Sequence, residues 1–259
     1  MNILIIGDIC GSSGRHTAAH FIPLIQKEHS IDLIIANGEN SAGGVGITAP
    51  VFDELIGLGI DVITSGNHIW DKKEILTFID QESRLIRPAN YPPGTPGSGY
   101  CVFVKNNLRI GVVNLAGRAF MPPIDCPFRE ADRILSEIKT QCDIIIIDFH
   151  AETTSEKMAL AWYLDGRVSC IVGTHTHIQT ADERILPQGT AYITDLGMVG
   201  PWNSVLGVDK DLVIKKFITG LPTRFSLADG PTVFCAIIVQ INDNTGKAEK
   251  IIRILKHLN

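Results

Sequence analysis

Five short segments of this sequence carry side chains that can bind metal ions, and each follows directly after an apolar run. Together they supply two carboxylates, two amides and four imidazoles: Asp8, Glu39, Asn40, Asn67, His68, His150, His175 and His177. We interpret all of these except His68 as metal ligands. Nitrogen and oxygen ligands without thiolate suit iron, manganese or zinc and disfavour calcium or magnesium. Because only two of the ligands are anionic, two divalent ions would keep a surplus of roughly two positive charges for a hydroxide and a phosphate.

Each segment also has an ordinary structural explanation when it is taken alone. Asp8 could lie in a turn or cap a helix, and residues 37–40 could form a turn rich in Asn and Gly. A lone His150 is more often a half-buried side chain than a ligand. Two histidines two residues apart occur by chance, although on an extended segment they would point the same way. The joint occurrence of five such segments in one chain favours a metal site.

The elements that must position these residues can be predicted from the apolar runs. Buried strands are expected at residues 2–7, 32–36, 61–64, 143–148 and 168–173, because short near-continuous apolar runs suit strands covered on both faces. Helical spacing occurs at residues 15–28, 51–58, 72–79, 129–140 and 155–164, with Asp71 and Thr154 as expected N-caps. The carboxyl ends of parallel strands share one edge of a sheet, where ligands bind. The five segments are therefore expected at one rim.

The later part of the chain changes character, because strands linked by short turns replace most of the helices. These strands are expected at residues 100–104, 108–115, 184–186, 190–194, 232–241 and 248–254, and the turn signal at 242–246 (NDNTG) predicts a hairpin between the last two. Two packed sheets covered by helices would accommodate both halves in an α/β fold. No repeat or convincing linker interrupts the chain, so we expect one domain over residues 1–259.

Composition limits the partners and the compartment. The net charge of −5 gives no basic surface for nucleic acid or anionic membranes, so no stable partner of either kind is expected. The six cysteines are scattered without a C-x-x-C pair, which is typical of reduced thiols in a cytoplasmic protein, and we interpret Cys10 as a packing residue. The apolar run at residues 3–6 ends too early for a signal peptide. A cytoplasmic location is therefore predicted.

The motifs resemble those of the calcineurin-like metallophosphoesterases. The shared residues are Gly7-Asp8, Gly66-Asn67-His68, His150 and Gly173-Thr174-His175-Thr176-His177. The sequence lacks the histidine of the usual first D-x-H segment, and Glu39 replaces the usual bridging aspartate. These departures resemble the YmdB-like branch, with G-D-I/V-x-G, N-x-E-N, S-G-N-H-x-W-D and G-T-H-T-H-x-Q-T-A-D. All four motifs are present, at residues 7–11, 37–40, 65–71 and 173–182.

The resemblance implies a four-layer α-β-β-α sandwich with a di-iron or similar centre. One ion would be held by Asp8, Glu39, Asn40 and His177. The other would be held by Glu39, Asn67, His150 and His175. Glu39 would bridge the two ions, and Asn40 would take the place of the missing histidine. Iron is the first expectation for the metal, with manganese or zinc as alternatives.

The resemblance also implies hydrolysis of 2′,3′- or 3′,5′-cyclic nucleotides. Two cations would lower the pKa of a bridging water, and the resulting hydroxide would attack phosphorus. The departing alkoxide needs a general acid, and His68 is the candidate because it adjoins Asn67 while its ring stays free. The alternative is that His68 orients Asn67 or a bound substrate.

Other functions and surfaces remain open from the sequence. The same centre could serve a phosphomonoesterase or 5′-nucleotidase, or a regulatory metal-binding protein with little turnover. Residues 41–46 (SAGGVG) and 200–209 are candidate pocket segments, although the first could be a plain turn. Trp70 and Trp202 could stack a base, although packing is the commoner role of a large aromatic. Residues 121–124 and 196–205 could form a lid or the interface of a homo-oligomer.

Overall fold

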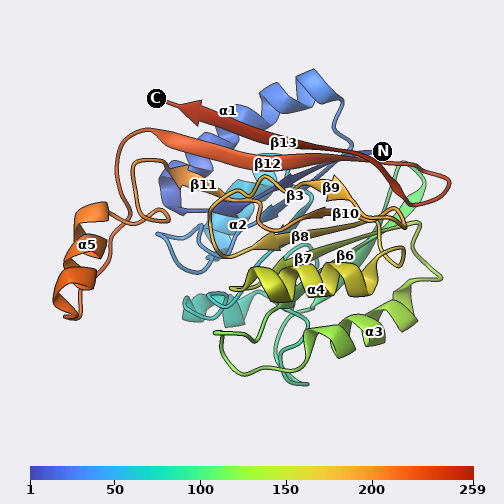
Figure 1. Ribbon diagram of the computed structural model, residues 1–259, viewed down its shortest axis with the longest axis horizontal. Coiled ribbons are helices and arrows are strands. Elements are labelled where there is room, and N and C mark those ends of the chain that lie inside the picture. Colours follow the sequence, from blue (N-terminus) through green and yellow to red (C-terminus); the bar gives the residue numbers. More distant parts are fainter.

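Two β-sheets pack face to face in the structure, a computed structural model that describes residues 1–259, and helices cover the outer faces (Figure 1). The first sheet has the order β2-β11-β12-β1-β3-β4, and β13 pairs with β12. Its strands are β1 (Asn2–Ile6), β2 (Asp8–Ile9), β3 (Leu33–Asn37), β4 (Val62–Thr64), β11 (Met198–Pro201), β12 (Thr232–Ile241) and β13 (Ala248–Leu258). The second sheet has the order β5-β6-β7-β8-β10-β9. Its strands are β5 (Tyr100–Lys105), β6 (Leu108–Ala116), β7 (Ile144–His150), β8 (Cys170–Thr174), β9 (Arg184–Ile185) and β10 (Ala191–Ile193).

Four of the five α-helices cover the sheets, and one stands apart. The helices are α1 (Gly11–His29), α2 (Ala49–Gly57), α3 (Pro127–Ile138), α4 (Thr154–Leu164) and α5 (Lys210–Thr219), with a short 3₁₀ helix η1 (Lys73–Thr77). Helices α1 and α2 pack on the first sheet, whereas α3 and α4 pack on the second. Figure 1 shows α5 projecting from the body beside the end of β11. None of the helices is long and apolar enough to cross a membrane.

Alternation along the strands produces three apolar layers between the four structural layers. In β1, Leu4 and Ile6 belong to the core shared with α1 and α2, whereas Ile3 and Ile5 belong to the core between the two sheets. Successive side chains of a strand point to opposite faces, so one apolar run serves both layers. The outer face of the second sheet packs on α3 and α4 in the same way. This arrangement confirms the four-layer α-β-β-α expectation.

The parallel strands bring two sheet edges to the same end of the molecule. Strands β1, β3 and β4 are parallel in the first sheet, and β6, β7, β8 and β10 are parallel in the second. Asn37 at the end of β3 donates through its Nδ2 to Asp148 Oδ2 of β7 at 3.1 Å, so the carboxyl ends of strands from both sheets meet. The rim predicted from the sequence is therefore built from two facing sheets rather than one.

Several local predictions differ from the structure. Residues 72–79 form only the 3₁₀ helix η1, and Asp71 is not its N-cap. Helix α4 is capped by Thr153 rather than Thr154, because the Thr153 hydroxyl accepts the backbone N–H of Glu156 at 3.4 Å. Strand β11 and helix α5 were not expected. The predicted hairpin of β12 and β13 is present, and the one-domain expectation stays a prediction.

The segment at residues 196–205, expected as an interface or lid, lies largely inside the protein. Leu196, Met198 and Val199 are buried, because β11 pairs with β2 and β12 in the first sheet. Only its later part is open to solvent, at Trp202 and Val205. None of the six cysteines forms a disulfide. Homo-oligomerisation and the cytoplasmic location stay predictions.

Candidate metal centre

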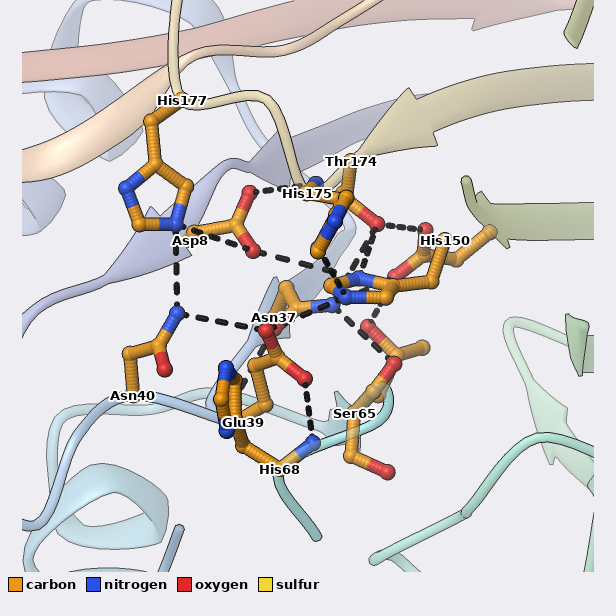
Figure 2. A network of polar contacts seen from close by, with 12 residues as sticks. Asp8, Asn37, Glu39, Asn40, Ser65, His68, His150, Thr174, His175 and His177 are labelled. Carbon is orange, nitrogen blue, oxygen red and sulfur yellow. Dashed lines mark hydrogen bonds and ion pairs between the residues drawn. The ribbon is translucent and has the colours of Figure 1, made fainter. Parts of the chain in front are cut away.

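The structure brings all seven predicted ligands and His68 to the end of the molecule where the two sheet edges meet. Figure 2 labels all of these residues except Asn67. The first sheet contributes Asp8 at the start of β2, Glu39 and Asn40 after β3, and Asn67 and His68 after β4. The second sheet contributes His150 at the end of β7, and His175 and His177 after β8. The candidate centre therefore lies between the sheets, and each sheet supplies part of it.

Three candidate ligand atoms converge on Nε2 of the His150 ring. Its Nε2 lies 3.1 Å from Glu39 Oε1, 3.1 Å from Asn67 Oδ1 and 3.0 Å from His175 Nδ1. Glu39, His150 and His175 offer ligand atoms that all lie within 4.8 Å of one another. The structure thus assembles the residues that the resemblance assigns to one of the two ions.

The other predicted set is more widely spaced. Asn40 Nδ2 lies 3.2 Å from Glu39 Oε1 and 3.2 Å from His177 Nε2. Asp8 Oδ1 lies 3.9 Å from His177 Nε2, and it is buried without any hydrogen-bond partner. Glu39 adjoins both sets, which suits a bridging carboxylate. Asn40 directs its amide nitrogen toward the centre, so metal ligation would require the amide to turn and present Oδ1.

The His150 ring is oriented by a relay of hydrogen bonds at the base of the site. Thr174 Oγ1 donates to Asp148 Oδ1 at 2.7 Å and therefore accepts from His150 Nδ1 at 2.9 Å. Asp148 is buried and also accepts hydrogen bonds from Thr64 Oγ1 and from Asn37 Nδ2. This relay leaves Nε2 of His150 as the nitrogen that faces Glu39.

The other two candidate ligand histidines are held in a similar way. His175 places Nε2 3.1 Å from Glu152 Oε2, and His177 places Nδ1 3.0 Å from the carbonyl oxygen of Leu206. In each ring the outward nitrogen has an acceptor, so the inward nitrogen is available as a ligand. Outer partners of this kind fix the tautomer and orientation of metal-binding histidines. The same arrangement at all three rings is the strongest geometric indication of a metal centre.

Burial and the neighbouring charges shift the pKa values of these residues. Burial raises the pKa of Asp8 above its usual range. Burial alone would raise the pKa of Glu39, but the charge and hydrogen bond of His150 lower it instead. Burial alone would lower the pKa of His150, and Glu39 raises it to about 9. Burial, together with His150, lowers the pKa of His175 to about 3. Glu39 and His150 thus each favour the charged form of the other.

The backbone around the centre is unusually constrained. His175 and His177 both have positive φ angles, 95° and 61°, which are uncommon for residues other than glycine and cluster at functional sites. Gly66 leaves no room for a side chain, because an added Cβ would lie 2.3 Å from both Glu39 Oε2 and His150 Nε2. The loop after β4 therefore closes over the Glu39–His150 pair.

These observations show that the residues fit a metal ion. Acceptor atoms of Glu39, Asn67, His150 and His175 face one another, and such atoms repel unless a cation or proton lies among them. The buried, unpaired Asp8 Oδ1 lacks a donor for the same reason. Buried carboxylates are stable when they are paired or coordinate metals. The donor set is nitrogen and oxygen only, which suits a transition metal.

Comparison with known proteins agrees with this centre. A family model described as YmdB-like protein matches residues 4–254. The chain belongs to the YmdB-like family. It is 52% identical over 255 residues to a Bacillus subtilis protein named 2′,3′-cyclic-nucleotide 2′-phosphodiesterase, covering 98% of this chain and 97% of that protein.

Two solved structures extend the family likeness to the whole fold. One is described as a novel phosphatase from Mycoplasma pneumoniae and is 34% identical, with a TM-score of 0.95 over 99% of this chain and 93% of that one. A protein from Thermus thermophilus is 40% identical, with a TM-score of 0.93 over 99% of both chains. The expected membership of the YmdB-like family is thus confirmed, and divalent metal ions are implied for this YmdB-like chain.

His68 lies beside the centre rather than within it. Its backbone N–H donates to Glu39 Oε2 at 3.2 Å, and its ring Nδ1 lies 2.7 Å from Asp71 Oδ2. The His68 side chain is 37% exposed and lines a cavity of about 350 Å³ that also reaches Glu39 and His177. No hydrogen bond joins the His68 ring to Asn67, so nothing in the geometry favours the alternative in which His68 orients that amide.

Both pocket segments expected from the sequence line this cavity, but the two tryptophans do not. Residues 43–45 form one side, and Leu206 and Val208 form part of another. Trp202 packs edge-on against His257 at 4.7 Å between ring centroids, and Trp70 packs edge-on against Tyr91 at 5.7 Å. These contacts favour a packing role for the two tryptophans over base stacking.

The residues that orient or contact the histidines of this YmdB-like site were not predicted from the sequence. Asp148, Thr174 and Glu152 orient histidines, and Asp71 contacts His68. The one local signal was Asp148, a charged residue within a strand of otherwise apolar residues, since a buried carboxylate needs partners. Glu152 gave no signal, because its partner is fixed only by the folded loops.

Proposed function

We propose that this chain is a metal-dependent phosphodiesterase that hydrolyses 2′,3′- or 3′,5′-cyclic nucleotides. The observation that carries the proposal is the convergence of Glu39, Asn67, His150 and His175, whose ligand atoms lie about 3 Å apart around His150 Nε2. The 52% identity with the Bacillus subtilis phosphodiesterase supports the reaction class. Two transition-metal ions are proposed as cofactors, iron first, with manganese or zinc as alternatives.

The proposed ligand sets are those implied by the family motifs. Asp8, Glu39, Asn40 and His177 would hold one ion, and Glu39, Asn67, His150 and His175 would hold the other. When bound, such ions supply Lewis acidity for a phosphate oxygen and lower the pKa of a bound water. The protein contributes fixed histidine tautomers through Thr174, Glu152 and the Leu206 carbonyl, so that the ligand nitrogens are presented without a proton.

His68 is proposed as the general acid for the departing alkoxide. Asp71 Oδ2 accepts the Nδ1–H of His68 at 2.7 Å, which leaves Nε2 as the nitrogen that can give up a proton. The backbone hydrogen bond from His68 N to Glu39 fixes where the ring stands relative to the metal ligands. Because the ring lines the cavity, it can reach a leaving group on a bound diester.

Metal analysis and a substrate panel test the proposal together. Protein purified without chelators should contain close to two transition-metal ions per chain. It should hydrolyse adenosine 2′,3′-cyclic phosphate, adenosine 3′,5′-cyclic phosphate or bis-p-nitrophenyl phosphate faster than p-nitrophenyl phosphate. A preference for the monoester would contradict the proposal, and inactivity of metal-loaded protein on every diester would indicate a regulatory metal-binding protein instead.

A phosphomonoesterase is the second candidate, and one observation favours it. The Mycoplasma pneumoniae structure that matches with a TM-score of 0.95 is described as a phosphatase. The same ligands and the same acid would serve a monoester. The two candidates differ in what the cavity must hold beyond the phosphate, because a cyclic nucleotide keeps its ribose and base close to the scissile bond.

A further inference from the structure

The cavity beside the metal centre has a polar end and an apolar end. The polar end contains Glu39, Asn40, His68, His175 and His177. The apolar end is formed by Val45, Leu206, Val208, Phe225 and Leu227. Its volume of about 350 Å³ falls in the range of small-molecule sites, roughly 300–1,000 Å³, which combine apolar walls with a few polar groups.

Four residues of the apolar end form a wall built from the segments on either side of the projecting helix α5: Leu206, Val208, Phe225 and Leu227. The backbone N–H of Asp209 donates to the Ser226 carbonyl at 2.9 Å, and the N–H of Ala228 donates to the Gly207 carbonyl at 3.0 Å. These bonds join the two segments before and after α5 (Figure 1). The Leu206 carbonyl in turn accepts from His177 Nδ1, so the wall is attached directly to a proposed ligand.

Glycines in the loop after β3 allow the wall to pack closely against that loop. A Cβ on Gly44, whose φ is 95°, would meet Leu227 Cδ2 at 3.1 Å. Leu227 therefore lies directly against the loop, and Val45, the next residue of that loop, also lines the cavity. The SAGGVG segment thus acts as a close-packed side of the cavity rather than as a plain turn.

Phe225 is the only aromatic ring other than histidine that lines this cavity. Its side chain is 42% exposed, and the neighbouring Leu206 is 44% exposed, so the apolar end is open to a ligand. Lys216 Nζ lies 4.8 Å from the Phe225 ring centroid and covers one face of the ring. The opposite face, which Lys216 does not cover, is where a planar ligand would stack.

We propose that Phe225, with Val45 and Leu206, forms a subsite that stacks the nucleobase of the substrate. The inference rests on the proposed phosphodiesterase function, because it places the phosphate of the same molecule at the metal centre. Aliphatic and aromatic side chains dominate this wall, and every base offers a π-face to stack. The subsite should therefore accept purines and pyrimidines alike, and it should contribute to substrate binding rather than to bond cleavage.

The test compares a substrate that has a base with one that lacks it. The substrates are adenosine 2′,3′-cyclic phosphate and methyl riboside 2′,3′-cyclic phosphate, which share the ribose and the cyclic diester. In Phe225→Ala, KM for the adenosine substrate should rise by roughly 5- to 150-fold, the range for loss of one stacked base. Its kcat should stay within about threefold, as expected for loss of uniform binding. Both constants for the base-free substrate should be unchanged.

Two further variants separate the contribution of an aromatic ring from that of an apolar side chain alone. Phe225→Trp keeps an aromatic surface and should retain a low KM for the adenosine substrate, whereas Phe225→Leu keeps apolarity without the ring and should behave more like Phe225→Ala. Phe217→Ala is the matched control, because Phe217 lies on α5, is 85% exposed and does not line the cavity. It should leave both substrates unaffected.

The outcomes distinguish failure of the subsite from failure of the proposed function. If the unaltered protein hydrolyses both substrates equally well, or if Phe225→Ala affects both equally, the nucleobase subsite is wrong while the phosphodiesterase stands. If neither substrate is hydrolysed, the proposed function is wrong. Calorimetric binding of adenosine 2′,3′-cyclic phosphate then decides the subsite: binding weakened by Phe225→Ala supports it, and absent or unaltered binding overturns it.

Discussion

His68 and the proposed ligand Asn67 are neighbours in the chain, yet their surroundings differ. The Asn67 side chain contacts the buried His150 ring, whereas the His68 ring contacts the exposed Asp71 and opens onto the cavity. Backbone hydrogen bonding to Glu39 fixes His68 without using its ring. In the proposed centre Asn67 would hold a metal, and His68 would keep a ring nitrogen free for proton transfer.

Replacing His68 by alanine should therefore separate catalysis from metal binding. The variant should lose roughly 10²- to 10⁴-fold in kcat, the usual contribution of a general acid, while its metal content stays that of the unaltered protein. Steady-state kinetics on a cyclic nucleotide and elemental analysis of the same preparation measure both. Loss of bound metal would show that His68 is a ligand and would refute the acid role.

Adding a single methyl group at Gly66 tests whether Glu39 and His150 bind the same metal ion. Gly66→Ala would place a Cβ 2.3 Å from Glu39 Oε2 and His150 Nε2, so one of the two side chains must move. Affinity for metal should fall at least about tenfold, so metal content should drop below that of the unaltered protein, while circular dichroism should show the fold retained. Gly57→Ala is the control, since nothing lies within 4 Å of its added Cβ in α2, and it should leave metal content unchanged. Normal metal content in Gly66→Ala would mean that Glu39 and His150 do not share an ion.

At the scale of elements, the ends of the strands could be predicted from the sequence. The side-chain contacts between residues at different strand ends could not. Apolar runs such as residues 143–148 indicate a strand locally, so the residues that follow it could be assigned to a rim. Asp71 resembled an N-cap because its neighbours have helical spacing, and only the folded loop shows it paired with His68. Phe225 follows an unexpected helix and gave no motif.

A buried ion pair links helix α4 to the segment that carries His175 and His177. Lys157 of α4 is 1% exposed and lies 2.7 Å from Asp195 Oδ2, in the segment after β10. Asp195 Oδ2 also accepts the backbone N–H of Thr176 at 3.1 Å and its hydroxyl at 2.7 Å. Thr176 lies between His175 and His177, both with positive φ. The pair therefore helps to hold the strained ligand segment in place.

Removing the lysine should destabilise the protein and loosen this segment. Lys157→Met should lower the free energy of unfolding by roughly 3–5 kcal/mol, because Asp195 would remain buried without its cation. Urea denaturation measures the loss. Lys256→Met is the matched control: Lys256 and Glu28 are 39% and 53% exposed at 3.8 Å, so less than about 1 kcal/mol is expected. A similar small effect for both variants would show that the buried pair does not stabilise the fold.

At the scale of the whole molecule, the centre joins two sheets that otherwise meet through an apolar layer. The core between them is formed by aliphatic side chains such as Ile5, Ile35 and Ile146, which contact one another without directional bonds. The proposed ligands come from both sides, with Asp8 and Glu39 from the first sheet and His150 and His175 from the second. A bound ion would therefore cross-link the sheets at the rim.

This cross-link predicts that metal removal lowers thermal stability as well as activity. Binding only to the folded state stabilises it by about 4 kcal/mol when free metal exceeds its dissociation constant 1,000-fold, which corresponds to a melting temperature roughly 8–16 °C higher. Differential scanning calorimetry with added manganese, and again after chelation, measures the difference. Glu39→Gln should lose most of it, because Glu39 contacts both ligand sets. Equal melting temperatures for metal-loaded and metal-free protein would show that the ions do not tie the sheets together.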